Sequence, residues 1–179
     1  MRTIEFCIPF IGVGIRYAEF LLANLHATAQ HPQRISVSMS VHNEADRGAI
    51  MQSAIGASVK KIVQAPPYPS SMRFQGSANH SRAINMLAAQ ADADIVIFSD
   101  YDMAFVASGW DARIESILDS CHFCGVAYPP MWLSMDLPEM RWAQNVPLAK
   151  YQGKPNLSFF ATTRTCLNEV FAKKLTDFD

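Results

Sequence analysis

Residues 83–102 constrain the fold of this chain most strongly. Their sequence, AINMLAAQADADIVIFSDYD, combines a helical pattern, a short turn, an apolar run and two aspartates one residue apart. The apolar positions with helical spacing are Ile84, Leu87, Ala88 and Ala91. Residues 95–98 then form an unbroken apolar run of strand length, which is typical of a strand covered on both faces. The stretch therefore predicts an α/β fold with a mostly parallel sheet.

Asp100 and Asp102 directly follow the predicted strand. In an extended segment, residues i and i+2 point the same way, so we expect both carboxylates to face one ligand. Two adjacent carboxylates repel each other unless a cation lies between them. A divalent cation, Mn2+ or Mg2+, that also binds a diphosphate meets this need. The alternative is an ordinary turn after a strand, where Asp is common.

This stretch resembles the nucleotide-sugar glycosyltransferases of the GT-A fold, and glycosyltransferase family 2 in particular. The matching positions are Asn85 in the helix, Asp94 before the strand, Asp100-Tyr101-Asp102 after it, and the turn at 105–110 followed by Asp111. The resemblance implies a Rossmann-like, three-layer α/β/α sandwich. It also implies inverting transfer of a sugar from a UDP- or GDP-sugar to a saccharide, lipid-linked or protein acceptor. Asp102 would bind the metal, and Asp100 would bind the metal or the donor ribose.

Further donor-binding positions follow from the same resemblance. Pro9-Phe10 matches a strand end that packs against the nucleotide base, and Asn43 stands near the place of a base-binding Asp. A polar turn, with Asp46 capping a helix, is the alternative at Asn43. An Arg in the first turns of a helix suits a diphosphate, although a solvated Arg is the alternative for Arg82. The complete expected set is Pro9, Phe10, Asn43, Asn79, Arg82, Asn85, Asp100 and Tyr101.

Periodicity predicts the remaining elements. Strands are expected at 4–10, 35–41, 59–63, 123–128 and 156–163. Helices are expected at 15–29, at 48–55, from Gly76 with Ser77 as its cap, at 109–120 with Ser108 as its cap, and at 165–175. In the first helix, we expect an inward face of Tyr17, Phe20, Leu21 and Leu25.

A Gly-x-Gly pair at Gly12 and Gly14 suggests a competing function. With Arg16 it resembles the glycine-rich loop of sugar-phosphate nucleotidylyltransferases, although the Lys-Pro that usually follows is absent. A dinucleotide loop would require a third glycine, which is also absent. A catalytically silent nucleotide-sugar binding module is the second competitor, because no catalytic base can be placed. The only acidic pair in the acceptor-side segment is Asp136 and Glu139.

The length of 179 residues predicts one domain. We expect a donor-binding half at 1–111 and a shortened acceptor-side half at 112–179. Trp132 or Trp142 would stack on a sugar ring or pack in the core. Residues 175–179 resemble the family turn that precedes the catalytic base, so the chain is expected to be either incomplete or a minimal donor-binding core.

Charge and cysteine content exclude several other classes. A net charge of −1 gives no basis for electrostatic binding of nucleic acid. The chain shows neither a membrane-spanning apolar run nor a signal-peptide pattern, so we expect a cytoplasmic location, with a peripheral membrane role if the acceptor is lipid-linked. Cys121 and Cys124 lack the second pair of a structural zinc site, so reduced thiols are expected. Because half of the residues are hydrophobic, a homodimer is a further expectation.

Overall fold

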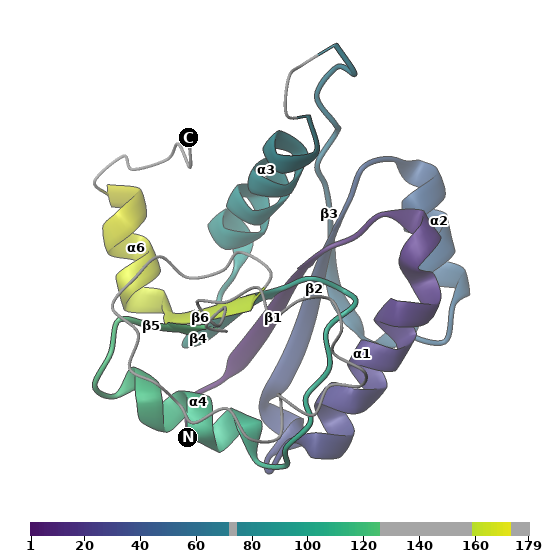
Figure 1. Cartoon of the computed structure of the whole chain (residues 1–179). Helices are drawn as coiled ribbons and strands as arrows, with labels where there is room; N and C mark the ends of the chain where they lie inside the picture. Colours follow the sequence, from purple (N-terminus) through teal and green to yellow (C-terminus); the bar gives the residue numbers. More distant parts are fainter. Residues whose placement is uncertain (72–74, 126–158, 173–179) are drawn as a thin grey trace, which may run out of the picture.

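A six-stranded sheet lies at the centre of the computed structural model, which describes residues 1–71, 75–125 and 159–172 (Figure 1). The strand order is β3-β2-β1-β4-β6-β5. The four strands β1 to β4 run parallel, whereas β6 pairs antiparallel with both β4 and β5. The strands are β1 (Ile4–Pro9), β2 (Ile35–Val41), β3 (Val59–Gln64), β4 (Ile95–Ser99), β5 (Phe123–Gly125) and β6 (Phe159–Thr163). The predicted α/β fold with a mostly parallel sheet is confirmed.

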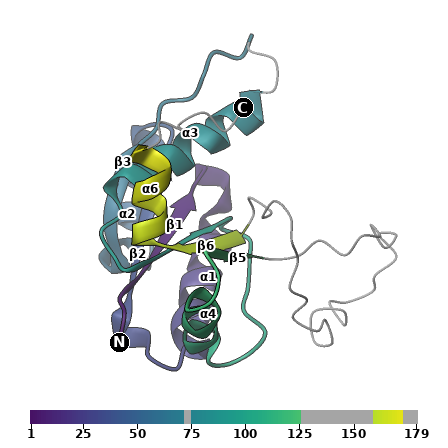
Figure 2. The same cartoon turned by 90° about the vertical axis from the view of Figure 1, so that its left-hand side faces the viewer.

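Helices cover both faces of this sheet (Figures 1 and 2). One face carries α1 (Ile15–Thr28), α2 (Glu44–Gln52) and α4 (Trp110–Leu118). The other carries α3 (Gln75–Gln90) and α6 (Arg164–Ala172). Three short 3-10 turns complete the described elements: η1 (Gly12–Gly14), η2 (Pro32–Arg34) and η3 (Gly56–Ser58). The result is the expected three-layer α/β/α arrangement.

The apolar run of β4 is buried on both sides because successive side chains of a strand point to opposite faces. Ile95 and Ile97 join the core beneath α1 and α4, whereas Val96 and Phe98 join the core beneath α3 and α6. The predicted inward face of α3 is confirmed, since all four of its apolar side chains are buried: Ile84, Leu87, Ala88 and Ala91.

The inward face of α1 differs from the prediction at two positions. Tyr17 and Phe20 are 62% and 61% exposed. Leu21 and Leu25 are buried as predicted, and Ala18 and Leu22 are buried beside them. Both stripes satisfy helical spacing, so the sequence pattern could not separate them. The sheet selects the narrower aliphatic stripe, which lets the helix pack close to the strands.

Three predicted helix caps are wrong. Helix α2 begins at Glu44 and contains Asp46, so Asp46 is not its cap. The cap is Asn43, whose Oδ1 accepts a 2.9 Å hydrogen bond from the Asp46 amide. Helix α4 is preceded by Gly109, which has a φ of 72° and makes no side-chain cap, so Ser108 does not fill that role. Ser77 lies inside α3, which already begins at Gln75. Each error shifts a boundary by a few residues, where local chemistry offers several equivalent starts.

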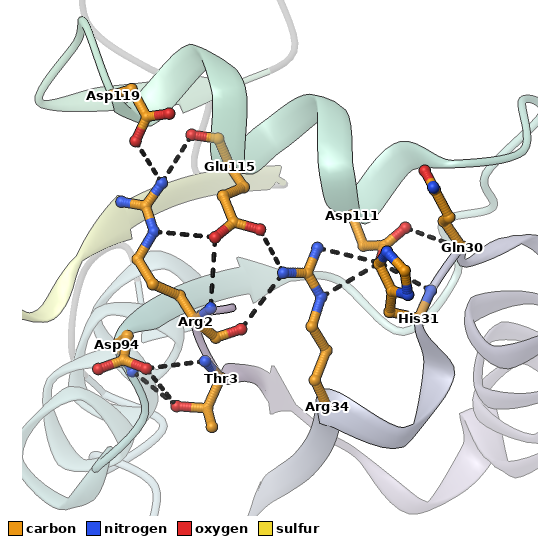
Figure 3. A network of polar contacts seen from close by, with 9 residues as sticks. All are labelled: Arg2, Thr3, Gln30, His31, Arg34, Asp94, Asp111, Glu115 and Asp119. Carbon is orange, nitrogen blue, oxygen red and sulfur yellow. Dashed lines mark hydrogen bonds and ion pairs between the residues drawn. The ribbon is translucent and has the colours of Figure 1, made fainter.

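A network of ion pairs and hydrogen bonds, buried at Arg34 and Asp111, lies at the amino-terminal edge of the sheet (Figure 3). Arg34 donates to Asp111 Oδ2 through Nε at 3.2 Å and through Nη2 at 3.0 Å. Glu115 bridges Arg34 to Arg2, whose Nε lies 3.2 Å from Glu115 Oε1. Here Asp94 accepts hydrogen bonds from both the amide and the hydroxyl of Thr3, at 2.8 and 2.9 Å. This edge is therefore filled by the protein's own ion pairs and hydrogen bonds.

Several expectations concern residues outside the described ranges. These are the ends of two predicted strands at 126–128 and 156–158, together with Trp132, Asp136, Glu139, Trp142 and residues 175–179. No helix among the described residues is both long and apolar enough to cross a bilayer.

Candidate functional site at the carboxyl edge of the sheet

The order of the strands reverses between β1 and β4, which is where open α/β sheets form a ligand-binding crevice. From β1 the chain proceeds outward to β2 and β3, whereas β4 lies on the opposite side of β1. In open α/β sheets, ligands bind outside the carboxyl ends of the strands at such a reversal. Phe10 follows β1 and Asp100 follows β4 at this point. The structure thus brings the two ends predicted for the donor site together.

The two aspartates lie beyond the regular part of the sheet. The last β4 residue in a strand pair is Ser99, which lies opposite Phe159. Tyr101 and Asp102 form a turn, so the strand alternation expected to align the two carboxylates does not extend to them. The Asp100 side chain is 31% exposed, and Asp102 is exposed. Their arrangement is therefore set by the turn and by the packing of its neighbours.

His80 is a neighbour of the aspartate pair that the sequence analysis missed. Its Nδ1 lies 3.7 Å from Asp100 Oδ1. Helix α3 leads into β4 through a short turn, so the amino-terminal half of the helix lies over the carboxyl edge of the sheet. The available signal was helical spacing, because His80 stands one turn before Ile84 on the inward face. This contact places an imidazole nitrogen beside the Asp100 carboxylate.

Tyr101 is directed into the protein rather than toward a ligand. Its ring meets the ring of Phe10 edge-on, with centroids 5.7 Å apart, and packs against Gly14. Burial, followed by the negative charges of Asp102 and Asp100, raises the pKa of the Tyr101 phenol above its ordinary value. Phe10 itself is 2% exposed, so its ring belongs to the core. Pro9 is the last residue of β1 beside it.

Asn79 and Arg82 both contact Tyr68, in the proline-rich segment before α3. The Tyr68 amide donates to Asn79 Oδ1 at 2.7 Å, and the Arg82 guanidinium lies 5.0 Å from the centre of the Tyr68 ring. Residues two apart on a helix are about 200° apart, so Arg82 and His80 occupy different faces of α3. Arg82 thus leans on Tyr68, whereas His80 faces the aspartates.

The two remaining expected residues lie at other parts of the same edge. Asn43 follows β2, is exposed, and uses its side-chain oxygen to cap α2. Asn85 is half-buried, one turn further along α3 than Arg82. Both assignments to the donor site stay predictions.

The aspartate pair suits a cation that is shared with a ligand. Among the residues that the structure describes, no group of three or more His, Cys, Asp or Glu side chains is placed to hold a metal ion. Asp100 and Asp102 supply hard oxygen donors, which Mg2+ and Mn2+ prefer. Mg2+ sites commonly take one or two carboxylates, with the other positions filled by phosphate and water. The residues present therefore fit a divalent cation bound together with a diphosphate.

The cysteines are free thiols, as expected. Cys121 and Cys124 are half-buried, and burial together with neighbouring Cys121 raises the pKa of Cys124 to about 11. A thiol with such a pKa remains protonated at neutral pH and is a poor nucleophile.

No family model and no curated protein matches this chain. Among solved structures, it is similar to the mannosyltransferase PcManGT from Pyrobaculum calidifontis in complex with GDP-Man and Mn2+, with a TM-score of 0.60, 11% identity, and coverage of 94% of this chain and 46% of that one. It is also similar to 4-diphosphocytidyl-2C-methyl-D-erythritol synthase from Anaerococcus prevotii, with a TM-score of 0.53, 10% identity, and coverage of 99% and 78%. TarS 1-349 from S. aureus matches with a TM-score of 0.47 and 16% identity over 67% of this chain and 33% of that one.

These likenesses show the fold. The sheet with helices on both faces is consistent with the expected GT-A arrangement. The match covers 46% of the PcManGT chain and 33% of TarS 1-349. At 10–11% identity, the two closer likenesses by TM-score do not transfer an activity to this chain.

Proposed function

We propose that this chain binds a nucleotide-sugar donor through a divalent cation and acts in the transfer of the sugar to an acceptor. The observation that carries the proposal is the position of Asp100 and Asp102, at the end of β4 and beside the end of β1. A ligand that carries a diphosphate and binds at this crevice would meet both carboxylates through a shared cation. Membership of glycosyltransferase family 2 is part of this proposal.

The two aspartates have different roles in this proposal, because they differ in exposure. Asp102 is exposed and would bind the cation, whereas Asp100 lies nearer to α3 and would bind the cation or the donor ribose. The cation supplies positive charge that offsets the negative charge on the departing diphosphate. An inverting transfer also needs a carboxylate that deprotonates the acceptor hydroxyl, and we assign no residue to that role. The complex of PcManGT with GDP-Man and Mn2+ supports the choice of donor class.

The runner-up is a sugar-phosphate nucleotidylyltransferase, and the similarity to the diphosphocytidyl-methylerythritol synthase favours it. The contacts of Gly12 and Gly14 are evidence against a nucleotidylyltransferase. The amide of Gly12 donates to Asp46 Oδ1 at 3.0 Å, and Gly14 is covered by the ring of Tyr101. A triphosphate in this loop would meet a carboxylate where it needs a free amide.

The first test is thermal unfolding with UDP, GDP and CDP, each with and without Mn2+. A ligand at 100 times its Kd stabilises the folded state by about 2.7 kcal/mol. For a chain of this size, that corresponds to a rise in Tm of about 5–10 °C. We expect the rise for UDP or GDP only when Mn2+ is present. Asp102→Asn should abolish it, and Glu169→Gln, an exposed carboxylate on α6, should retain it. No rise with any nucleotide would refute the proposal.

Product analysis separates the competing functions. Release of a nucleoside diphosphate from a nucleotide sugar in the presence of an acceptor identifies a transferase. Formation of a nucleotide sugar from a nucleoside triphosphate and a sugar phosphate would identify the nucleotidylyltransferase instead. Metal-dependent donor binding with neither product would identify the silent binding module.

A further inference from the structure

We infer that Tyr101 is a positioning residue for the aspartate pair, and that Gly14 is glycine because the Tyr101 ring occupies the space of a side chain there. The inference rests on the proposed function, since the pair is taken to hold the cation. It assigns a role to Gly14 that neither a dinucleotide loop nor a nucleotidylyltransferase loop explains.

The strand pairing of the sheet ends before the two aspartates. Pairing of β4 with β1 ends at Phe98, and pairing with β6 ends at Ser99. The turn at Tyr101 and Asp102 follows these last pairs. Two flanking carboxylates repel each other, so a turn without an anchor would let them separate. Asp100 also contacts His80, and Tyr101 is the residue whose packing can fix the turn that carries both carboxylates.

The packed side chain of Tyr101 fixes this turn. Its side chain is partly buried against the core that contains Phe10, and the two rings meet edge-on at 69°. On its other side the ring touches Gly14 so closely that an added Cβ at Gly14 would lie 2.7 Å from the ring carbons Cδ2 and Cζ. The ring is thus held from two sides, and the residues before and after it carry the carboxylates.

Residue 14 must be glycine because the Tyr101 ring leaves no room for a side chain, and not because of its backbone conformation. Its φ is −97°, which other residues adopt, and it is buried. Gly12 in the same 3-10 turn is a natural comparison. A Cβ there would meet Asp46 Oδ1, the end of a side chain that can rotate away. An alanine at Gly12 is therefore expected to be accommodated, whereas an alanine at Gly14 must displace a packed ring.

The experiment measures Mn2+ affinity by electron paramagnetic resonance of free Mn2+, with UDP or GDP present and no acceptor. Loss of a residue that supports a metal ligand typically costs about 10–100-fold in metal affinity. We expect Gly14→Ala and Tyr101→Ala each to weaken Mn2+ binding by that factor. Gly12→Ala and Tyr101→Phe should stay within about twofold of the wild type, because Tyr101→Phe keeps the ring.

The double variant Gly14→Ala/Tyr101→Ala tests whether the two substitutions act through the same contact. If the clash with Tyr101 is the cause, adding Gly14→Ala to Tyr101→Ala changes Mn2+ affinity by no more than about twofold. Full additivity of the two effects would overturn the inference. Should Gly14→Ala fail to fold, Tyr101→Ala against Tyr101→Phe decides the question.

The outcomes also separate this inference from the proposed function. Wild-type protein that binds Mn2+ with nucleotide, while Gly14→Ala and Tyr101→Ala bind it equally well, would refute the positioning role alone. Wild-type protein with no nucleotide-dependent Mn2+ binding would refute the proposed function and the positioning role together.

Discussion

Asp111→Ala tests how much the buried network at the amino-terminal edge contributes to stability. The Asp111 side chain is fully buried and accepts four hydrogen bonds: from the amides of Gln30 at 2.7 Å and His31 at 3.0 Å, and from Arg34 Nε at 3.2 Å and Nη2 at 3.0 Å. Breaking a buried ion pair on one side costs about 3–5 kcal/mol, because the remaining charge is left uncompensated. Arg34 keeps its contact with Glu115, so the lower end applies. We therefore expect a loss of about 3 kcal/mol.

Urea unfolding at neutral pH measures this loss, and the corresponding fall in Tm is about 6–12 °C. The matched control is Asp119→Ala, which removes a carboxylate that binds Arg2 in the same network but is 67% exposed. Exposed ion pairs contribute at most about 1 kcal/mol. A loss below about 1 kcal/mol for Asp111→Ala would refute the reasoning, because it would show that the buried arginine needs no partner at this position.

Two further predictions concern pH and packing. Hydrogen bonds from Arg34 and Arg2 outweigh burial and lower the pKa of Glu115 from 4.5 to about 2, so its contribution to stability is complete above pH 4.5 and is lost as the pH falls toward 2. Urea midpoints of Glu115→Gln should therefore change less between pH 5 and pH 3 than those of the wild type, and an equal change would contradict the assignment. On α1, Leu21→Ala should cost about 2–5 kcal/mol and Phe20→Ala no more than about 0.5 kcal/mol, because only Leu21 is buried. Comparable losses in urea unfolding would show that Phe20 is covered by another part of the protein.

Local periodicity predicted the helices and strands of the described residues well, because it reports burial directly. The apolar run at 95–98 could only be satisfied by a strand between two layers, and the structure has β4 there. Caps were predicted less well. Asn43 and Asp46 are alternative caps of α2, and Ser108 and Gly109 are alternative residues before α4. Which residue precedes the helix depends on where the preceding strand or loop ends.

The candidate site was predicted in part. The aspartate pair was located by its place at the carboxyl end of a buried strand, where ligands of open α/β sheets bind. The ends of β1 and β2 were proposed from the family resemblance. Three contacts were not predicted: that of His80 with Asp100, that of Arg82 with Tyr68, and that of the Tyr101 ring with Gly14. Each joins segments that are distant in sequence or turned away from one another by a loop.

The sequence by itself determined the alternation of apolar strands and helices, and with it the α/β class and the edge of the sheet that carries Asp100 and Asp102. Periodicity and strand-end chemistry are local properties, so one chain suffices to reveal them. Only the tertiary structure decided which α1 stripe is buried and which residues surround the aspartates. The physical reason is that the pairing of β4 with β6 ends at Ser99, so strand pairing does not fix the turn that follows. The conformation of this turn depends instead on the residues that pack against Tyr101, which include Phe10 and Gly14.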